Sequence, residues 1–143
     1  MMYKLYCRDS SVTEPLEWSD ISLILTDAPN ENTLSTKEIE NIIRKYRLMS
    51  GKFPYIAICK DENLNSFELS YQFPHSAFGG NFMEKVKFAR NIIIKLTKPF
   101  DVVLDPFCGY SATGFAAMLE SRRYIGIDNK PEAIKESEKR LTN

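Results

Sequence analysis

The chain has 143 residues, 43% of them hydrophobic and 12% aromatic, which suits one folded domain over residues 1–143 with a core of its own. Its 19 basic and 19 acidic residues give a formal net charge of +0, which argues against a large basic face for non-specific binding of nucleic acid. The single histidine argues against a metal site built from several histidines. The three cysteines include no C-x-x-C pair and suit a reducing cytoplasm. No apolar run approaches the ~20 residues of a membrane span.

Two strand patterns occupy the first part of the chain, and an acidic residue follows each of them. Residues 3–7 alternate as a short strand and lead to Asp9, which by itself is a turn residue. Residues 21–26 are almost continuously apolar, as expected for a buried parallel strand. They lead into the tetrapeptide Asp27-Ala28-Pro29-Asn30. Taken alone, these four residues are an ordinary turn after a strand.

A helix with a strong start signal comes next. Ser35-Thr36-Lys37-Glu38 is a capping box, and Leu34 and Ile39 are placed as a hydrophobic staple. Apolar residues continue at helical spacing as far as Gly51. The sequence therefore predicts an amphipathic helix from about residue 36 to about residue 50.

The middle of the chain is less regular. Residues 53–59 resemble another buried strand, and the aromatic segment that follows predicts a short strand at residues 67–73. Gly79-Gly80 predicts a mobile loop. Residues 84–98 again have helical spacing, and Pro99 ends that helix.

The last third carries the most informative pattern, a strand, a turn, a helix and a second strand. Residues 102–104 form a short apolar strand that ends in Asp105, and apolar residues recur at helical spacing from Ala112 to Leu119. Residues 124–128 form a second strand that ends in Asp128. Two parallel strands joined by a crossover helix make half of a nucleotide-binding fold, in which the second acid typically contacts ribose hydroxyls.

A family resemblance rests on these residues. Asp105-Pro106-Phe107-Cys108-Gly109, with Gly126-Ile127-Asp128, resembles the S-adenosylmethionine site of the DNA amino-methyltransferases, which act on adenine N6 or cytosine N4. The resemblance implies an α/β, Rossmann-like methyltransferase fold with a mostly parallel sheet flanked by helices, and S-adenosylmethionine as cofactor. It implies that these residues hold the cofactor: Asp9, Asp105, Pro106, Phe107, Gly109, Tyr110, Ser111 and Asp128.

The same resemblance assigns a role to the tetrapeptide after the second strand. Asp27-Ala28-Pro29-Asn30 is similar to the family's catalytic motif, D-P-P-Y or S-P-P-Y. In that motif the first side chain and the second carbonyl accept hydrogen bonds from the target amine, and the fourth residue stacks on the base. A catalytic strand that precedes the cofactor strand is typical of the beta class of these enzymes.

Several positions depart from the family's pattern. Ser111 stands for a glycine, Asn30 for the aromatic residue and Glu84-Lys85 for a Lys-Pro pair, and the target-recognition region is missing. One hypothesis is a minimal methyltransferase that modifies an exocyclic amine of a nucleic-acid base, in DNA more readily than in RNA. A second is a catalytically inactive S-adenosylmethionine-binding or regulatory subunit. A third is a structural remnant that binds a larger partner and no ligand. Because the target-recognition region is missing, a second copy of the chain or a partner subunit is expected to supply target recognition.

Overall fold

In the computed structural model, which describes residues 2–12, 14–30, 32–62, 64 and 71–142, the described strands form one six-stranded sheet. Every strand pair in it is parallel. The strands are β1 (Tyr3–Cys7), β2 (Ile21–Asp27), β3 (Tyr55–Cys59), β4 (Tyr71–Phe73), β5 (Val102–Asp105) and β6 (Arg123–Asp128). The helices are α1 (Thr36–Met49), α2 (Phe82–Leu96), α3 (Ala112–Leu119) and α4 (Pro131–Thr142), with a 3₁₀ helix, η1, at His75–Phe78.

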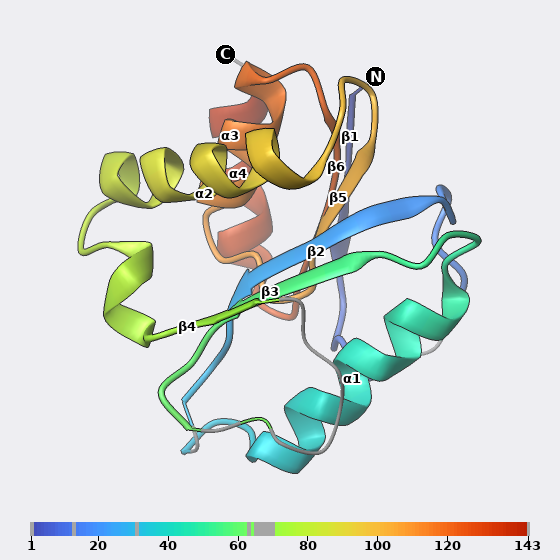
Figure 1. The fold of residues 1–143 in the computed structure, drawn as a ribbon, viewed down its shortest axis with the longest axis vertical. Helices are drawn as coiled ribbons and strands as arrows, with labels where there is room; N and C mark the ends of the chain where they lie inside the picture. The colour runs from blue at the N-terminus through green and yellow to red at the C-terminus, as the bar shows by residue number, and fades with distance from the viewer. Residues whose placement is uncertain (1, 13, 31, 63, 65–70, 143) are drawn as a thin grey trace.

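The strand order is β1-β6-β5-β2-β3-β4, so β2 and β5 are the central pair. From β5 the chain continues outward to β6, and from β2 it continues outward in the other direction to β3. The helix α1 follows β2 and covers one face of the sheet, whereas α2, α3 and α4 cover the other (Figure 1). The direction of winding therefore reverses between β2 and β5. In open α/β sheets, ligands bind beyond the carboxyl ends of the strands at such a reversal.

Both faces of the central strands are buried, which explains their nearly continuous apolar sequences. In β2, Leu23 and Leu25 pack toward α2 and α3, whereas Ile21 and Ile24 pack toward α1. All four side chains are 0% exposed. Because successive side chains point to opposite faces of a strand, only a strand covered by helices on both sides needs apolar residues at every position.

Hydrogen-bonded caps fix the start of both long helices. The predicted capping box of α1 is confirmed, since Ser35 Oγ accepts from the Glu38 N–H and Glu38 Oε1 accepts from the Ser35 N–H. The helix α2 has an equivalent box between Asn81 and Glu84, so it begins at Phe82 and not at Glu84. Residues 81–84 have the Asn-x-x-Glu pattern of a capping box, so the sequence alone could have predicted this helix start. Local hydrogen bonding at the start of the helix is enough to explain why position 84 is a glutamate.

The segment before α2 differs in part from its sequence-based description. The expected loop at Gly79-Gly80 lies between η1, which ends at Phe78, and α2; Gly79 has a φ of 107°, and the Gly80 N–H donates to Glu84 Oε1 at 3.1 Å. Of the strand expected at residues 67–73, the structure has Tyr71–Phe73, and residues 65–70 lie outside the described residues. None of the helices in the described ranges is long and apolar enough to cross a bilayer.

Close packing of α3 on β6 depends on a glycine. A Cβ atom at Gly114 would lie 2.4 Å from the ring of Tyr124, which is fully buried. An alanine normally stabilises a helix relative to glycine by about 1 kcal/mol, but overpacking a core against a rigid ring costs about 1–3 kcal/mol. We therefore expect Gly114→Ala to lower the free energy of unfolding, measured by urea denaturation. Gly51→Ala is the control, because its Cβ would meet only Asp20 Oδ1 at 3.9 Å. Equal midpoints for the two variants would contradict the packing argument.

Candidate functional site

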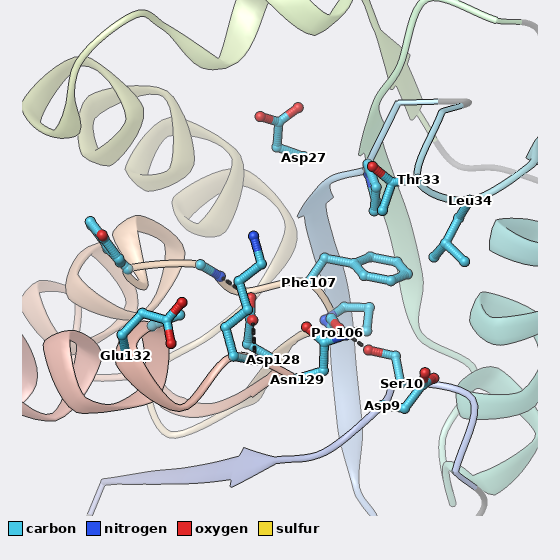
Figure 2. A pocket seen from close by; sticks show the side chains of 15 residues that line it. Asp9, Ser10, Asp27, Thr33, Leu34, Pro106, Phe107, Asp128, Asn129 and Glu132 are labelled. Carbon is cyan, nitrogen blue, oxygen red and sulfur yellow. Dashed lines mark hydrogen bonds between the residues drawn. The ribbon is translucent and has the colours of Figure 1, made fainter.

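Two adjoining cavities open at the carboxyl ends of the strands. The larger has a volume of about 680 Å³ and the smaller of about 350 Å³. Figure 2 shows the larger cavity, with Asp9, Asp27 and Asp128 among the side chains around it. Four residues line both cavities: Asp27, Phe107, Gly109 and Tyr110. The two spaces therefore form one candidate site, and acids from several strand ends contribute to it.

Asp105 lies at the inner wall of the smaller cavity, where β5 ends beside β2. Its side chain is buried, and Oδ1 accepts hydrogen bonds from the Thr26 hydroxyl at 2.6 Å and from the Phe107 N–H at 3.1 Å. Burial raises the pKa of Asp105 to about 7, although these two hydrogen bonds act in the opposite direction. The carboxyl group therefore links the two central strands and shapes the first turn after β5.

The turn after β5 is attached to the end of β6 by hydrogen bonds from its backbone. Asp128 Oδ2 accepts from the Gly109 N–H and Oδ1 from the Lys130 N–H, both at 3.0 Å. The Cys108 N–H donates to the Ile127 carbonyl at 2.9 Å. Gly109 has a φ of 52°, in the left-handed region that favours glycine. Asp128 thus lines the larger cavity and at the same time fixes the turn that borders both cavities.

Ser111 occupies the position at which the family has a glycine. Its φ is 64° and its ψ is 46°, so it adopts the left-handed conformation that a glycine would favour. The side chain is 0% exposed, and its hydroxyl lies 2.9 Å from the hydroxyl of Tyr124. Because Ser111 points into the core and lines neither cavity, the serine does not occupy space that a ligand would need.

The loop after β1 brings Asp9 to the rim of the larger cavity. Asp9 Oδ1 accepts from the N–H and from the hydroxyl of Ser11, and these hydrogen bonds lower the pKa of Asp9. The neighbouring Ser10 is buried, its hydroxyl donates to the Pro106 carbonyl, and its carbonyl accepts from the Tyr46 hydroxyl at 3.0 Å. The loop is therefore held between the turn after β5 and the helix α1.

Asp27 ends β2 and lines both cavities, as the sequence-based site requires. Its side chain is 25% exposed, and Oδ1 lies 2.7 Å from Nδ1 of His75. Burial raises the pKa of Asp27, and the neighbouring charges of His75 and Lys85 act against that rise. The carboxylate is thus partly desolvated and lies within a small group of charged side chains.

The rest of the tetrapeptide is only partly in the site. Ala28 is buried and its N–H donates to the Cys59 carbonyl at 3.2 Å. Pro29 lines the larger cavity, and its carbonyl lies 3.4 Å from Nζ of Lys60, a lysine that is almost fully buried. Asn30 is exposed and lines neither cavity, and its Oδ1 accepts from the Asn32 N–H at 3.1 Å in a local turn.

Sequence reasoning did not identify His75 or Arg140 as residues of the site, and it named Lys85 only within a departure from the family's pattern. His75 contacts Asp27, and Lys85 and Arg140 line the smaller cavity. The guanidinium of Arg140 lies 4.1 Å from the centre of the Phe82 ring and 5.8 Å from that of Tyr110. Nothing in the local sequence indicates these contacts, because their partners lie on other elements. Among the described residues, no group of three metal-ligating side chains comes together.

Comparison with known proteins finds a family match over part of the chain. Residues 84–139 match the family model described as DNA methylase. The type II methyltransferase M.HinfI of Haemophilus influenzae is 48% identical over 50 residues, which are 35% of this chain and 14% of that protein. The DNA adenine methyltransferase YhdJ of Escherichia coli (strain K12) is 42% identical over 52 residues, which are 36% of this chain and 18% of that protein. The matched region thus spans less than a fifth of either relative.

Solved structures are similar over nearly the whole chain. A complex of M1.HpyAVI with SAM has a TM-score of 0.69 at 18% identity and covers 99% of this chain and 100% of its own. TTHA0409 of Thermus thermophilus, described as a DNA modification methylase, has a TM-score of 0.73 at 13% identity, with coverages of 98% and 94%. At such low identity the likeness is one of fold. It confirms the expected α/β, Rossmann-like architecture.

The chain thus has a Rossmann-like fold of the kind found in methyltransferases. Residues 84–139 are similar to the DNA methylase family, in the region where the Asp105–Gly109 turn and the Asp128 strand end carry the predicted resemblance. The family match includes β5, α3 and β6, and β2 with its tetrapeptide lies outside it.

Burial of Asp105 predicts a pH dependence of stability. The folded-state pKa of about 7 lies above the usual value of 3.8, so the folded state binds the proton more tightly. Stability from this group is then complete below about pH 4 and is lost as the pH rises toward 7, by up to about 1.4 kcal/mol for each pKa unit. We expect Asp105→Asn to become more stable relative to the native chain over this window in denaturant titrations. Asp20→Asn supplies the background for removal of a surface carboxylate. If the difference in unfolding free energy between Asp105→Asn and the native chain did not change with pH, this result would contradict the raised pKa of Asp105.

Proposed function

We propose that the chain binds S-adenosylmethionine in the two adjoining cavities and transfers its methyl group to an exocyclic amine of a nucleic-acid base. DNA is the preferred substrate over RNA. The observation that carries this proposal is the position of Asp27 on the same two cavities as the Asp105–Gly109 turn, at the reversal between β2 and β5. A methyl donor and an acceptor amine have to meet at one point, and the two motifs that carry the resemblance come together there.

The residues of the site suit the chemistry of the proposed cofactor. The larger cavity lies within the ~300–1,000 Å³ of small-molecule sites, and the carboxylates of Asp9 and Asp128 line it as acceptors for ribose hydroxyls. Lys85 and Arg140 line the smaller cavity and offer cations to the carboxylate of a methionyl group. The family's Lys-Pro pair is absent here, but Glu84 caps α2 and Lys85 still brings a cation to the site.

Asp27 is proposed to act on the acceptor. Its carboxylate and the carbonyl of Ala28 would accept hydrogen bonds from the target amine and orient the nitrogen lone pair. S-adenosylmethionine, when bound, supplies an electrophilic methyl group on a sulfonium. Alignment and electrostatic complementarity are the main requirements of such a transfer, so a hydrogen-bond acceptor suffices where no strong base is present.

Tyr110 is proposed to replace the stacking residue of the tetrapeptide. Asn30 cannot stack on a base, and its side chain is engaged in its own turn. Tyr110 is 52% exposed and lines both cavities, whereas Phe78, an aromatic residue of the smaller cavity, is 3% exposed. Stacking of a base on an aromatic side chain contributes about 1–3 kcal/mol.

Target recognition is proposed to come from outside this domain. The chain is neutral overall and residues 1–143 are proposed to form one methyltransferase domain, so a second copy or a partner subunit would provide the contacts that select a DNA sequence. We place this activity in the cytoplasm. The alternative, an inactive subunit that binds S-adenosylmethionine, predicts cofactor binding without transfer.

The cofactor proposal predicts a loss of affinity in Asp128→Ala. This variant removes an acceptor for ribose hydroxyls and also the partner of the Gly109 N–H. A hydrogen bond to a charged group contributes about 1.5–3 kcal/mol, so the dissociation constant for S-adenosylmethionine in calorimetry should rise about ten- to a hundredfold. Asp20→Ala, an exposed acid with a lysine partner at 3.7 Å, is the matched control. Unchanged affinity in a folded Asp128→Ala variant would exclude this role for Asp128.

The acceptor proposal predicts that binding and transfer separate at Asp27. Asp27→Ala should abolish transfer of a labelled methyl group to DNA, because it removes the side chain that orients the amine. Affinity for S-adenosylmethionine should stay within a few-fold, since Asp27 faces the acceptor. If the native chain binds the cofactor but labels neither DNA nor RNA, even with a cell extract as a source of partner subunits, the inactive-subunit alternative replaces the enzyme.

A further inference from the structure

A histidine contacts the acid that we propose to orient the amine. Nδ1 of His75 lies 2.7 Å from Oδ1 of Asp27, and the histidine side chain is 61% exposed against 25% for the aspartate. His75 is the one histidine of the 143-residue chain. Oδ1 is shielded from solvent and has no aligned hydrogen-bond partner, so its polar contact is the ion pair with the imidazole. The pair joins η1 to the end of β2.

Surrounding contacts hold His75 in this position. Its backbone N–H donates to Asp61 Oδ1 at 2.9 Å. The N–H of Lys60, beside Asp61, donates to the Phe73 carbonyl at 2.9 Å and so connects the end of β3 to the end of β4. Phe78, at the other end of η1, is 3% exposed and packs against Phe88 with ring centres 5.5 Å apart. The turn that carries His75 is thus fixed at both ends.

The charge state of Asp27 depends on groups from several elements. Burial raises its pKa, and so does the charge of Asp61, whereas the charges of His75 and Lys85 lower it. The buried Asp105 and Cys59 also face Asp27 electrostatically. His75 makes the closest of these contacts and is the foremost influence that favours the charged carboxylate. Without it, a partly desolvated acid would face mainly other acidic groups and one lysine.

We propose that His75 is a positioning residue for methyl transfer, whose imidazole holds Oδ1 of Asp27 so that Oδ2 is directed to the acceptor amine. The inference rests on the proposed function, because it assigns His75 a role through Asp27. The imidazole restrains the rotation of the carboxylate and keeps it in the charged form, which is the better hydrogen-bond acceptor. His75 itself does not touch the cofactor or the amine.

A first experiment tests the coupling without any activity measurement. The carboxyl carbon of Asp27 is followed by NMR against pH, with Asp27→Asn used to assign the signal. In His75→Ala the titration midpoint should move to higher pH by roughly one unit, because an opposite charge within contact distance favours the ionised acid. His75→Asn retains a donor near the position of Nδ1 and should recover part of the shift. An unchanged midpoint in His75→Ala would overturn the proposal.

A second experiment tests the consequence for transfer. In His75→Ala the kcat for methyl transfer to DNA should fall about tenfold near neutral pH, with the acidic limb of the profile moved to higher pH and the affinity for S-adenosylmethionine within a few-fold. His75→Asn should recover most of kcat. Ser76→Ala, an exposed neighbour on η1, is the matched control.

The outcomes separate the inference from the proposed function. Transfer by the native chain with the same pH profile in His75→Ala would overturn the role of His75 and leave the proposed function standing. Absence of transfer in the native chain would overturn the proposed function and with it the role of His75, even where the NMR midpoint shifts.

Discussion

The buried carboxyl of Asp105 is the interaction on which the arrangement of the site depends. It lies where the two central strands end side by side. It accepts one hydrogen bond from the hydroxyl of Thr26 in β2 and another from the Phe107 N–H in the turn after β5. A buried acid is costly, and its raised pKa reflects that cost. The hydrogen bonds that it makes fix the distance between the strand that carries Asp27 and the turn that borders both cavities. Packing of helices on opposite faces then leaves the space between those strand ends open.

The three aspartates at strand ends differ in burial and in structural role. Asp105 is enclosed and structural, Asp128 is half-buried and accepts from backbone N–H groups with both oxygens, and Asp27 stays partly exposed beside a histidine. These differences follow from depth, because the turn after β5 folds over Asp105 whereas β2 ends at the open rim. A neutral chain can in this way present an acidic site with two local cations, Lys85 and Arg140, in its smaller cavity. The proposed cofactor is a zwitterion with an added positive sulfonium, which matches such a division of charge.

The departures from the family's pattern have separate structural explanations. Ser111 adopts the backbone conformation of the glycine that it replaces and turns its hydroxyl into the core toward Tyr124. Glu84 caps α2 and leaves the neighbouring Lys85 in the smaller cavity. Asn30 is different, since its side chain closes a local turn and leaves the stacking position without an aromatic ring. Two of the three substitutions are thus compatible with an open ligand site, and the third bears only on how a base would be held.

The sequence by itself determined most of the elements and a family resemblance. Periodicity and caps predicted β2, α1, β5, α3 and β6, because hydrogen bonding and burial within one element depend on neighbouring residues. The Asp105–Gly109 turn and Asp128 indicated the family for the same local reason. Only the tertiary structure decided which side chains meet: His75 with Asp27 and Arg140 with Phe82 come from elements far apart in the chain. It also decided which acids are buried and therefore have altered pKa values, since desolvation depends on everything that packs around a group and not on the residues beside it in sequence.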